Sequence, residues 1–312
     1  MPGEAMIEAH GLRKSFGETV ALDGLDLEAR AGTVLGVLGP NGAGKTTAVR
    51  ILTTLSKPHC GEARVAGHDV VREPNAVQRM IGVAAQDATV DAVLSGRRNL
   101  VMIGRLCGLP RSDARARAAE LLSRFGLADA ADRIVKGYSG GMRRRLDLAA
   151  ALVARPLVLF LDEPTTGLDP TSRLMMWEVI RSLVNDGTTL LLTTQYLDEA
   201  DELADRIVVV DHGRAIAEGT PEELKRQVGG ARLEVTLSEP QPEATRALAA
   251  FATGTVSASA DNRHLRAPVN GNSGVATTVV RALDAAAITV EDVQVRPPSL
   301  DDVFMALTAG ER

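Results

Sequence analysis

The stretch Gly39-Pro-Asn-Gly-Ala-Gly-Lys-Thr46 decides the fold of this chain of 312 residues. It matches the pattern G-x-x-x-x-G-K-[ST], follows the apolar run Thr33-Val-Leu-Gly-Val-Leu38 and opens a helical stretch from Lys45 to Ser56. In such a strand–turn–helix arrangement, glycines allow backbone N–H groups to surround a phosphate, and the helix N-terminus adds positive potential. The stretch therefore predicts a P-loop, a backbone cradle for the phosphates of a nucleotide.

Each position of the P-loop has an expected role. We expect Lys45 to reach the β- and γ-phosphates and take part in catalysis, Thr46 to offer its hydroxyl to Mg²⁺, and Thr47 to bond the α-phosphate. The other cofactor-binding residues predicted here are Gly39, Pro40, Asn41, Gly42, Ala43 and Gly44.

A second motif, Leu157-Val-Leu-Phe-Leu-Asp-Glu163, is an apolar strand that ends in two carboxylates. Asp162 at the strand end can hold Mg²⁺, directly or through water. Glu163 then points toward the γ-phosphate and can polarise an attacking water. Two acids after a strand can also merely cap a helix, but their place downstream of a P-loop favours the catalytic interpretation.

The first 220 or so residues alternate short apolar runs with helical stretches. This alternation predicts an α/β fold with a parallel sheet covered on both faces. The segment Thr19–Glu28 alternates apolar and polar residues, which indicates a half-exposed antiparallel strand. Between Arg97 and Gly126, two helical stretches separated by Gly108-Leu-Pro110 predict a mostly helical insertion.

The composition changes near Gly229-Gly230. The residues from 231 to 295 predict the order β-α-β-β-α-β, a ferredoxin-like α+β pattern, and Ser299 to Leu307 predicts a closing helix. The chain length also suits two domains. We expect a nucleotide-binding domain over 1–228 with a helical subdomain at about 90–155, a linker within 220–231, and an accessory domain over 229–312.

The composition is that of a globular protein, with 45% hydrophobic and 24% charged residues. A net charge of −5 provides no broad basic surface for nucleic acid, and 3% aromatic residues argue against a stacking platform. The N-terminus contains no apolar signal-peptide core, and the longest apolar runs fall far short of the roughly 18 residues of a membrane span. We therefore expect no nucleic-acid partner, and a membrane role only through docking onto a partner.

Together with the P-loop, four further motifs resemble those of ABC-transporter ATPases, in the same order along the chain. Tyr138-Ser-Gly-Gly-Met-Arg-Arg-Arg145 is similar to their signature motif, and Asp162-Glu-Pro-Thr-Thr-Gly-Leu-Asp169 to their Walker B motif and D-loop. Gln86 resembles the Q-loop glutamine, and Phe16 the aromatic residue that stacks on adenine. The resemblance covers about residues 4–225.

This resemblance implies ATP and Mg²⁺ as cofactors and an ATP-dependent homodimer. In such a dimer Ser139, Gly140 and Gly141 of one subunit face the γ-phosphate held by the P-loop of the other. It also implies that Gln86 and Asp169 contribute to nucleotide binding, with Gln86 close to Mg²⁺. The expected fold gains an antiparallel β subdomain and a helical subdomain beside a mixed-sheet core.

Two positions depart from the common family pattern. The signature reads Tyr-Ser-Gly-Gly-Met where Leu-Ser-Gly-Gly-Gln is common, and Gln195 stands where the family usually has a switch histidine. Glutamine can hydrogen-bond a phosphate but cannot carry a proton at neutral pH, which favours Glu163 as the base and Gln195 as a positioning group. The three arginines 143–145 form either a solvated helix face or a surface for the membrane partner or another acidic surface.

A narrower resemblance is to the daunorubicin-resistance (DrrA-like) type, carried by Gln195-Tyr-Leu-Asp-Glu-Ala-Asp201 and by Pro298-Ser-Leu-Asp-Asp-Val-Phe-Met-Ala-Leu-Thr308. Such proteins are peripheral subunits on the cytoplasmic side of the membrane that power antibiotic export by a separate integral membrane subunit. The alternatives are export of a lipid or polysaccharide cargo, import, and a soluble ABC ATPase of DNA repair or translation. The single P-loop and the lack of a long coiled-coil insertion oppose the last.

Overall fold

The chain folds into two compact units, Met1–Pro221 and Glu222–Arg312. The computed structural model describes residues 4–85, 89–227, 231–269, 274–296 and 299–309. Helix α8 (Pro221–Gln227) occupies most of the stretch in which the sequence predicts a linker. In the described part of the chain, no helix is both long enough and apolar enough to cross a bilayer.

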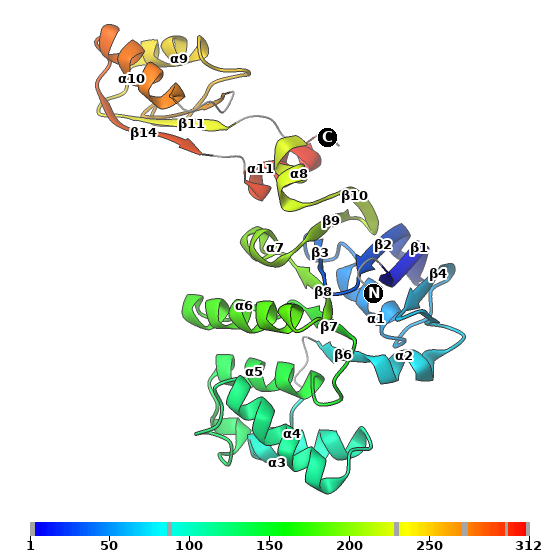
Figure 1. Cartoon of the computed structure of the whole chain (residues 1–312). Helices are drawn as coiled ribbons and strands as arrows, with labels where there is room; N and C mark the ends of the chain where they lie inside the picture. Colours follow the sequence, from blue (N-terminus) through cyan, green and yellow to red (C-terminus); the bar gives the residue numbers. More distant parts are fainter. Residues whose placement is uncertain (1–3, 86–88, 228–230, 270–273, 297–298, 310–312) are drawn as a thin grey trace. The chain divides into compact units, whose positions relative to one another are not determined.

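A six-stranded sheet forms the centre of the first unit, with the strand order β10-β9-β3-β8-β7-β6 (Figure 1). Its strands are β3 (Val34–Leu38), β6 (Ile81–Ala84), β7 (Val158–Asp162), β8 (Thr189–Thr194), β9 (Arg206–Asp211) and β10 (Arg214–Gly219). All but β10 run parallel, and β3, β7 and β8 are buried at every position. Burial on both faces explains why these strands appear in the sequence as unbroken apolar runs. The prediction of a parallel sheet is confirmed, with an antiparallel edge strand added.

Helices cover both faces of this sheet (Figure 1). On one face, α7 (Leu197–Leu203) contacts β3 and β8, and α6 (Pro170–Asn185) lies beside it. On the other, α1 (Lys45–Leu52) contacts β7 and the antiparallel sheet described next. The same apolar cluster includes Ile51 and Leu52 of α1 and Phe160 of β7.

The antiparallel sheet has the order β2-β1-β4-β5. Its strands are β1 (Ala5–Phe16), β2 (Thr19–Arg30), β4 (Cys60–Val65) and β5 (His68–Asp69). Every second residue from Leu25 to Ala29 is buried, as the alternation of apolar and polar residues in β2 predicts. Helix α2 (Pro74–Met80) leads from this sheet back to β6.

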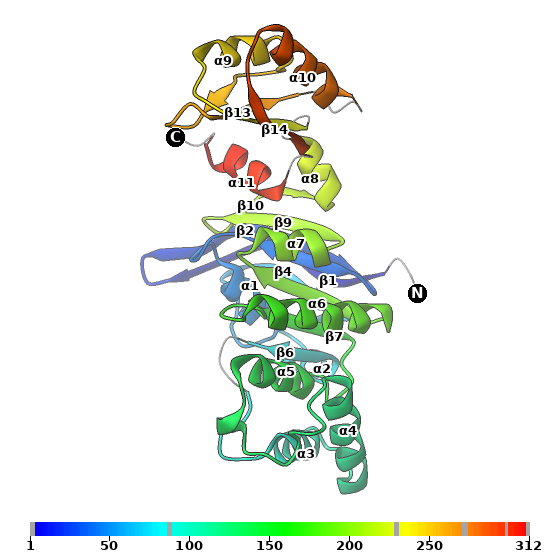
Figure 2. The ribbon, with the colours of Figure 1, turned by 90° about the vertical axis from the view of Figure 1, so that its left-hand side faces the viewer.

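The helical insertion contains α3 (Gly96–Leu106), α4 (Arg111–Arg124), a 3₁₀ turn at Val135–Gly137 and α5 (Gly140–Ala151). Figure 2 shows α3, α4 and α5 grouped together. The predicted break between the first two helices is confirmed, because Gly108 has a φ of +87° and Pro110 precedes α4.

The second unit has a four-stranded antiparallel sheet in the order β12-β13-β11-β14, with two helices on one of its faces (Figure 1). Its elements are β11 (Arg232–Leu237), α9 (Pro242–Ala249), β12 (Ser257–Ala258), β13 (His264–Pro268), α10 (Val275–Ala285), β14 (Val290–Arg296) and α11 (Leu300–Ala309). This order confirms the ferredoxin-like pattern, although β12 is only two residues long. Its core is formed by side chains such as Leu233, Leu248 and Leu283.

Candidate nucleotide-binding site

The P-loop joins β3 to α1, and its path requires glycine at two positions. Gly44 has a φ of +108°, and a Cβ atom there would lie 2.4 Å from the carbonyl oxygen of Ala21. A Cβ atom on Gly39 would lie 2.2 Å from the carbonyl oxygen of Val210. The loop therefore packs closely against β2 and β9 with its backbone, which leaves its other side free to surround a ligand.

A pocket of about 390 Å³ opens over the P-loop. Its lining includes Asn41, Gly42, Gly44, Lys45, Thr46, Thr47, the start of β2 and Glu163. Ala43, which also belongs to the P-loop, is buried. The pocket thus contains most of the predicted phosphate-binding residues together with the predicted base.

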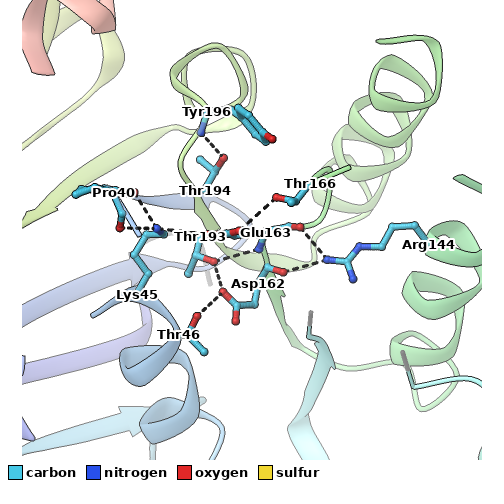
Figure 3. A network of polar contacts seen from close by, with 11 residues as sticks. Pro40, Lys45, Thr46, Arg144, Asp162, Glu163, Thr166, Thr193, Thr194 and Tyr196 are labelled. Carbon is cyan, nitrogen blue, oxygen red and sulfur yellow. Dashed lines mark hydrogen bonds and ion pairs between the residues drawn. The ribbon is translucent and has the colours of Figure 1, made fainter. Parts of the chain in front are cut away.

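Lys45 is only 4% exposed and has three oxygen partners around its ammonium group (Figure 3). Its Nζ donates hydrogen bonds to the carbonyl oxygens of Gly39 at 2.8 Å and Pro40 at 3.0 Å. It also forms an ion pair with Oε1 of Glu163 at 3.4 Å. The cation that we expect to bind phosphate is therefore held inside the pocket, next to the predicted base.

The first carboxylate of the acidic pair is tied to the P-loop helix. Oδ1 of Asp162 accepts hydrogen bonds from Oγ1 of Thr46 at 3.3 Å and from Oγ1 of Thr193 at 2.5 Å. Hydroxyl and carboxylate oxygens are the ligands that Mg²⁺ prefers, so the donor set of Thr46 and Asp162 fits this ion. Gln86, the third residue predicted near the metal, lies outside the described residues.

Glu163 has an unusual backbone conformation. Its φ is +50°, in the left-handed region, where a residue with a Cβ atom carries strain of roughly 1–3 kcal/mol. Its N–H group donates to the carbonyl oxygen of Thr193 at 3.1 Å, and its Oε2 accepts from Oγ1 of Thr166 at 3.3 Å. Lys45 and Thr166 thus hold the two carboxylate oxygens.

A second pocket, of about 690 Å³, is lined by Asn41, Glu163 and Gln195, and also by Gly140 at the start of α5. Gln195 follows β8 directly and is partly exposed. The structure therefore brings the predicted positioning glutamine into one pocket with the predicted base.

The remaining signature and D-loop residues gather where α5 and α6 begin. Ser139 caps α5 by accepting a hydrogen bond from the N–H of Met142 at 3.2 Å. Asp169 caps α6 through bonds from the N–H and Oγ of Ser172, and these bonds lower the pKa of Asp169. A Cβ atom on Gly141 would lie 2.6 Å from Oγ of Ser172, so the two helix N-termini are in close contact.

Phe16 ends β1 and is 55% exposed. It pairs with Thr19 across the β1–β2 hairpin, and Thr19 lines the P-loop pocket. The Nζ atom of Lys14 lies 5.3 Å from the centroid of the Phe16 ring. The ring is thus accessible for stacking near this pocket, as its predicted contact with adenine requires.

The interpretation of arginines 143–145 as a solvated helix face is wrong for Arg144 and Arg145. The Arg144 guanidinium donates to the carbonyl oxygens of Ala85, Asp162, Glu163 and Pro164. Arg145 donates to the carbonyl oxygen of Phe125 at 2.9 Å. Successive residues on a helix point about 100° apart, so these two consecutive arginines reach different neighbours.

Sequence reasoning also missed Glu199, which is fully buried on α7. Its Oε1 accepts hydrogen bonds from Oγ1 of Thr165 at 2.8 Å and from Nε1 of Trp177 at 3.2 Å. Burial raises the pKa of this carboxyl group. The available signal was its spacing from apolar residues of α7, because Glu199 lies four residues before Leu203 and therefore on the same buried face of the helix.

A P-loop joined to an Asp–Glu pair at the end of another parallel strand of the same sheet defines a P-loop nucleotide hydrolase. Comparisons with known proteins give the family. The family model "ABC transporter" matches residues 22–166, and "ATP-binding protein DrrA1-3-like, C-terminal domain" matches residues 219–308.

Relatives match over both units of the chain. "Daunorubicin resistance ATP-binding protein DrrA3" of Streptomyces coeruleorubidus is 55% identical, over 99% of this chain and 98% of that protein. "Nod factor export ATP-binding protein I" of Ralstonia nicotianae is 38% identical, over 98% and 94%. A solved dimeric ATP-binding cassette in a post-hydrolysis state, bound to ADP and phosphate, is 25% identical with a TM-score of 0.63, covering 69% of this chain and 98% of that chain.

The chain belongs to the DrrA-type family of ABC-transporter ATP-binding proteins. As a member of this family it binds and hydrolyses ATP and works with a membrane transporter component.

Proposed function

We propose that this chain energises the export of hydrophobic antibiotics through a separate integral membrane subunit. The observation that carries the proposal is the 55% identity to a daunorubicin-resistance protein, which extends over both units. We place the chain at the cytoplasmic face of the membrane as a peripheral subunit, and residues 229–312 as an accessory domain that supports dimerisation or docking. A lipid-like or saccharide cargo is the second candidate, favoured by the 38% identity to a Nod factor export protein.

In this proposal Lys45 exchanges its carbonyl and carboxylate partners for the β- and γ-phosphates, and Thr47 with the P-loop N–H groups binds the other phosphate oxygens. Phe16 stacks on the adenine ring. Thr46, Asp162 and Gln86 are the residues that would hold Mg²⁺. When bound, the ion neutralises charge that develops on the phosphates.

Glu163 acts as the general base, taking a proton from the attacking water through its carboxylate. Gln195, which lines the same pocket, orients that water or the γ-phosphate by hydrogen bonding. Two copies of the chain form a head-to-tail dimer in which Ser139, Gly140 and Gly141 of one copy meet the γ-phosphate at the other copy's P-loop. Asp169 then lies close to the dimer interface.

The catalytic assignment is tested by Glu163→Gln. We expect hydrolysis to fall by about 10²–10⁴-fold because the base is lost, while ATP still binds and holds the dimer together. Phosphate release, equilibrium ATP binding and size-exclusion chromatography with ATP measure these three properties. Glu178→Gln is the matched control, since Glu178 is exposed on α6. Wild-type hydrolysis by Glu163→Gln, without dimer accumulation, would contradict the assignment.

The cargo is tested by expressing the chain with its membrane subunit in a drug-sensitive host. We expect reduced daunorubicin accumulation with the wild-type chain and none of this reduction with Glu163→Gln. Equal accumulation with both chains would exclude this drug as the cargo and favour the lipid or saccharide alternative.

A further inference from the structure

One guanidinium on the signature helix holds the backbone at the catalytic acids. Arg144 of α5 donates from Nη2 to the carbonyl oxygens of Asp162 at 3.0 Å and Glu163 at 2.9 Å (Figure 3). Its Nε donates to the carbonyl oxygen of Pro164 at 2.8 Å, and its Nη1 to that of Ala85 at 2.7 Å. All three of its nitrogen atoms are therefore engaged, and three of the four acceptors are consecutive residues around the predicted base.

These contacts act on the dihedral angles of Glu163. The carbonyl of Asp162 belongs to the peptide plane before the Cα atom of Glu163, and the carbonyl of Glu163 belongs to the plane after it. Because peptide planes are rigid, fixing both of them fixes the φ and ψ angles between them. The φ of Glu163 is +50°, a conformation that persists only where its surroundings enforce it.

Figure 3 shows Lys45 and Arg144 on opposite sides of the acidic pair. Lys45 contacts the Glu163 carboxylate, whereas Arg144 contacts only main-chain carbonyls at this site. The two cations thus have different tasks. Lys45 contacts the Glu163 carboxylate itself, and Arg144 fixes the backbone that determines where this carboxylate points.

We propose that Arg144 is a positioning residue for ATP hydrolysis, which holds Glu163 in its left-handed conformation and so aims the carboxylate into the pocket. The inference rests on the proposed role of Glu163 as the base. Arginine suits this task because its planar, five-donor fork can bond several carbonyls at once, which neither a lysine ammonium nor a glutamine amide can reproduce.

The test compares Arg144→Gln and Arg144→Lys with Arg145→Gln in the full-length chain. Arg145 is the matched control, since it lies on the same helix and its guanidinium donates to the Phe125 carbonyl and not to the backbone at the acidic pair. A misplaced catalytic group costs about 100-fold in rate, so we expect Arg144→Gln to lower kcat by about that factor. We expect KM and ATP affinity to change by less than about threefold, a partial recovery with lysine, and near-wild-type activity for the control.

A double variant separates positioning from general destabilisation. In a Glu163→Gln chain the base is already absent, so adding Arg144→Gln should lower kcat no further. An equal loss of kcat in both backgrounds, or a raised KM with kcat unchanged, would overturn the positioning role. If Arg144→Gln does not fold, Arg144→Lys carries the same comparison. A wild-type kcat in the Glu163→Gln single variant would instead reject Glu163 as the base. This outcome differs from the outcomes that would reject the positioning role of Arg144.

Discussion

The two units of the chain use their interiors differently. In the first unit, Lys45, Asp162, Glu163, Thr193 and Glu199 are buried polar or charged side chains. In the described part of residues 222–312, every buried residue is apolar, and charged groups of its sheet pair at the surface, as Arg266 of β13 does with Glu234 of β11. Burying a charge without partners costs free energy, and the buried charged groups of the first unit have hydrogen-bond or ion-pair partners. The described interior of the second unit contributes packing of apolar side chains.

This contrast suggests that stability and catalysis can be perturbed separately. A change in the apolar core of the second unit should act on folding, whereas a change at a polar group that lines the nucleotide pockets of the first unit should act on ATP turnover. The following predictions test that separation, in order of decreasing effect.

The largest effect is expected from Leu233→Ala in the core of the second unit. Leu233 is fully buried, and such truncations lower the free energy of unfolding by about 2–5 kcal/mol. ATP affinity should stay unchanged, because the P-loop pocket is formed by first-unit residues. Urea denaturation and equilibrium ATP binding measure the two properties, with Leu106→Ala, exposed on α3, as the control. A joint loss of stability and ATP affinity would break the comparison.

A smaller effect is expected from Gln195→Ala at the end of β8. Losing a hydrogen bond to a charged group costs roughly 1.5–3 kcal/mol, which is about ten- to a hundred-fold in rate. Gln195→His should keep substantial activity, because imidazole can make the same contact. Steady-state phosphate release measures both variants. If Gln195→Ala hydrolyses ATP like the wild type, this position does not contact the γ-phosphate.

The smallest effect is expected from Glu199→Gln, and only as a change in pH dependence. Burial raises the pKa of Glu199 in the folded state above its ordinary value of 4.5. The folded state therefore binds this proton more tightly than the unfolded state, and the free energy of unfolding falls as pH rises from 4.5 through the folded pKa. Glu199→Gln removes the titrating group and should flatten this slope in denaturation series at several pH values. Exposed Glu178→Gln should leave the slope intact, and an unaltered slope in Glu199→Gln would refute the assignment.

Much of the site was predictable because its residues are consecutive in short motifs. The P-loop has a fixed spacing of glycines and lysine between a strand and a helix. Asp162 and Glu163 directly follow an unbroken apolar run that predicts a buried strand. Gln195 was found through the family resemblance, as the residue after a strand where a switch histidine is usual. For these positions the local sequence fixes the backbone, and the parallel sheet then brings the strand ends to one edge.

Sequence reasoning missed residues whose role depends on which way the side chain points in the folded chain. Nothing in the run 143–145 distinguishes the arginine that holds the Glu163 backbone from its neighbours. Sequence reasoning also missed β4 and the edge strand β10, for a related reason. They are short and mostly exposed, so they lack the apolar runs that mark the central strands.

The ion pair between Lys45 and Glu163 has one further consequence. Each group serves as the other's counter-ion, so the lysine offers an incoming triphosphate little net charge. The initial attraction then comes from the N–H groups of the P-loop and from the N-terminus of α1. The nucleotide must displace the Glu163 carboxylate from its ion pair with Lys45. Glu163 therefore competes with ATP for Lys45 before it acts as the general base. Neutralising Glu163 removes that competitor, and part of any gain in ATP affinity then has an electrostatic origin that is independent of halted turnover.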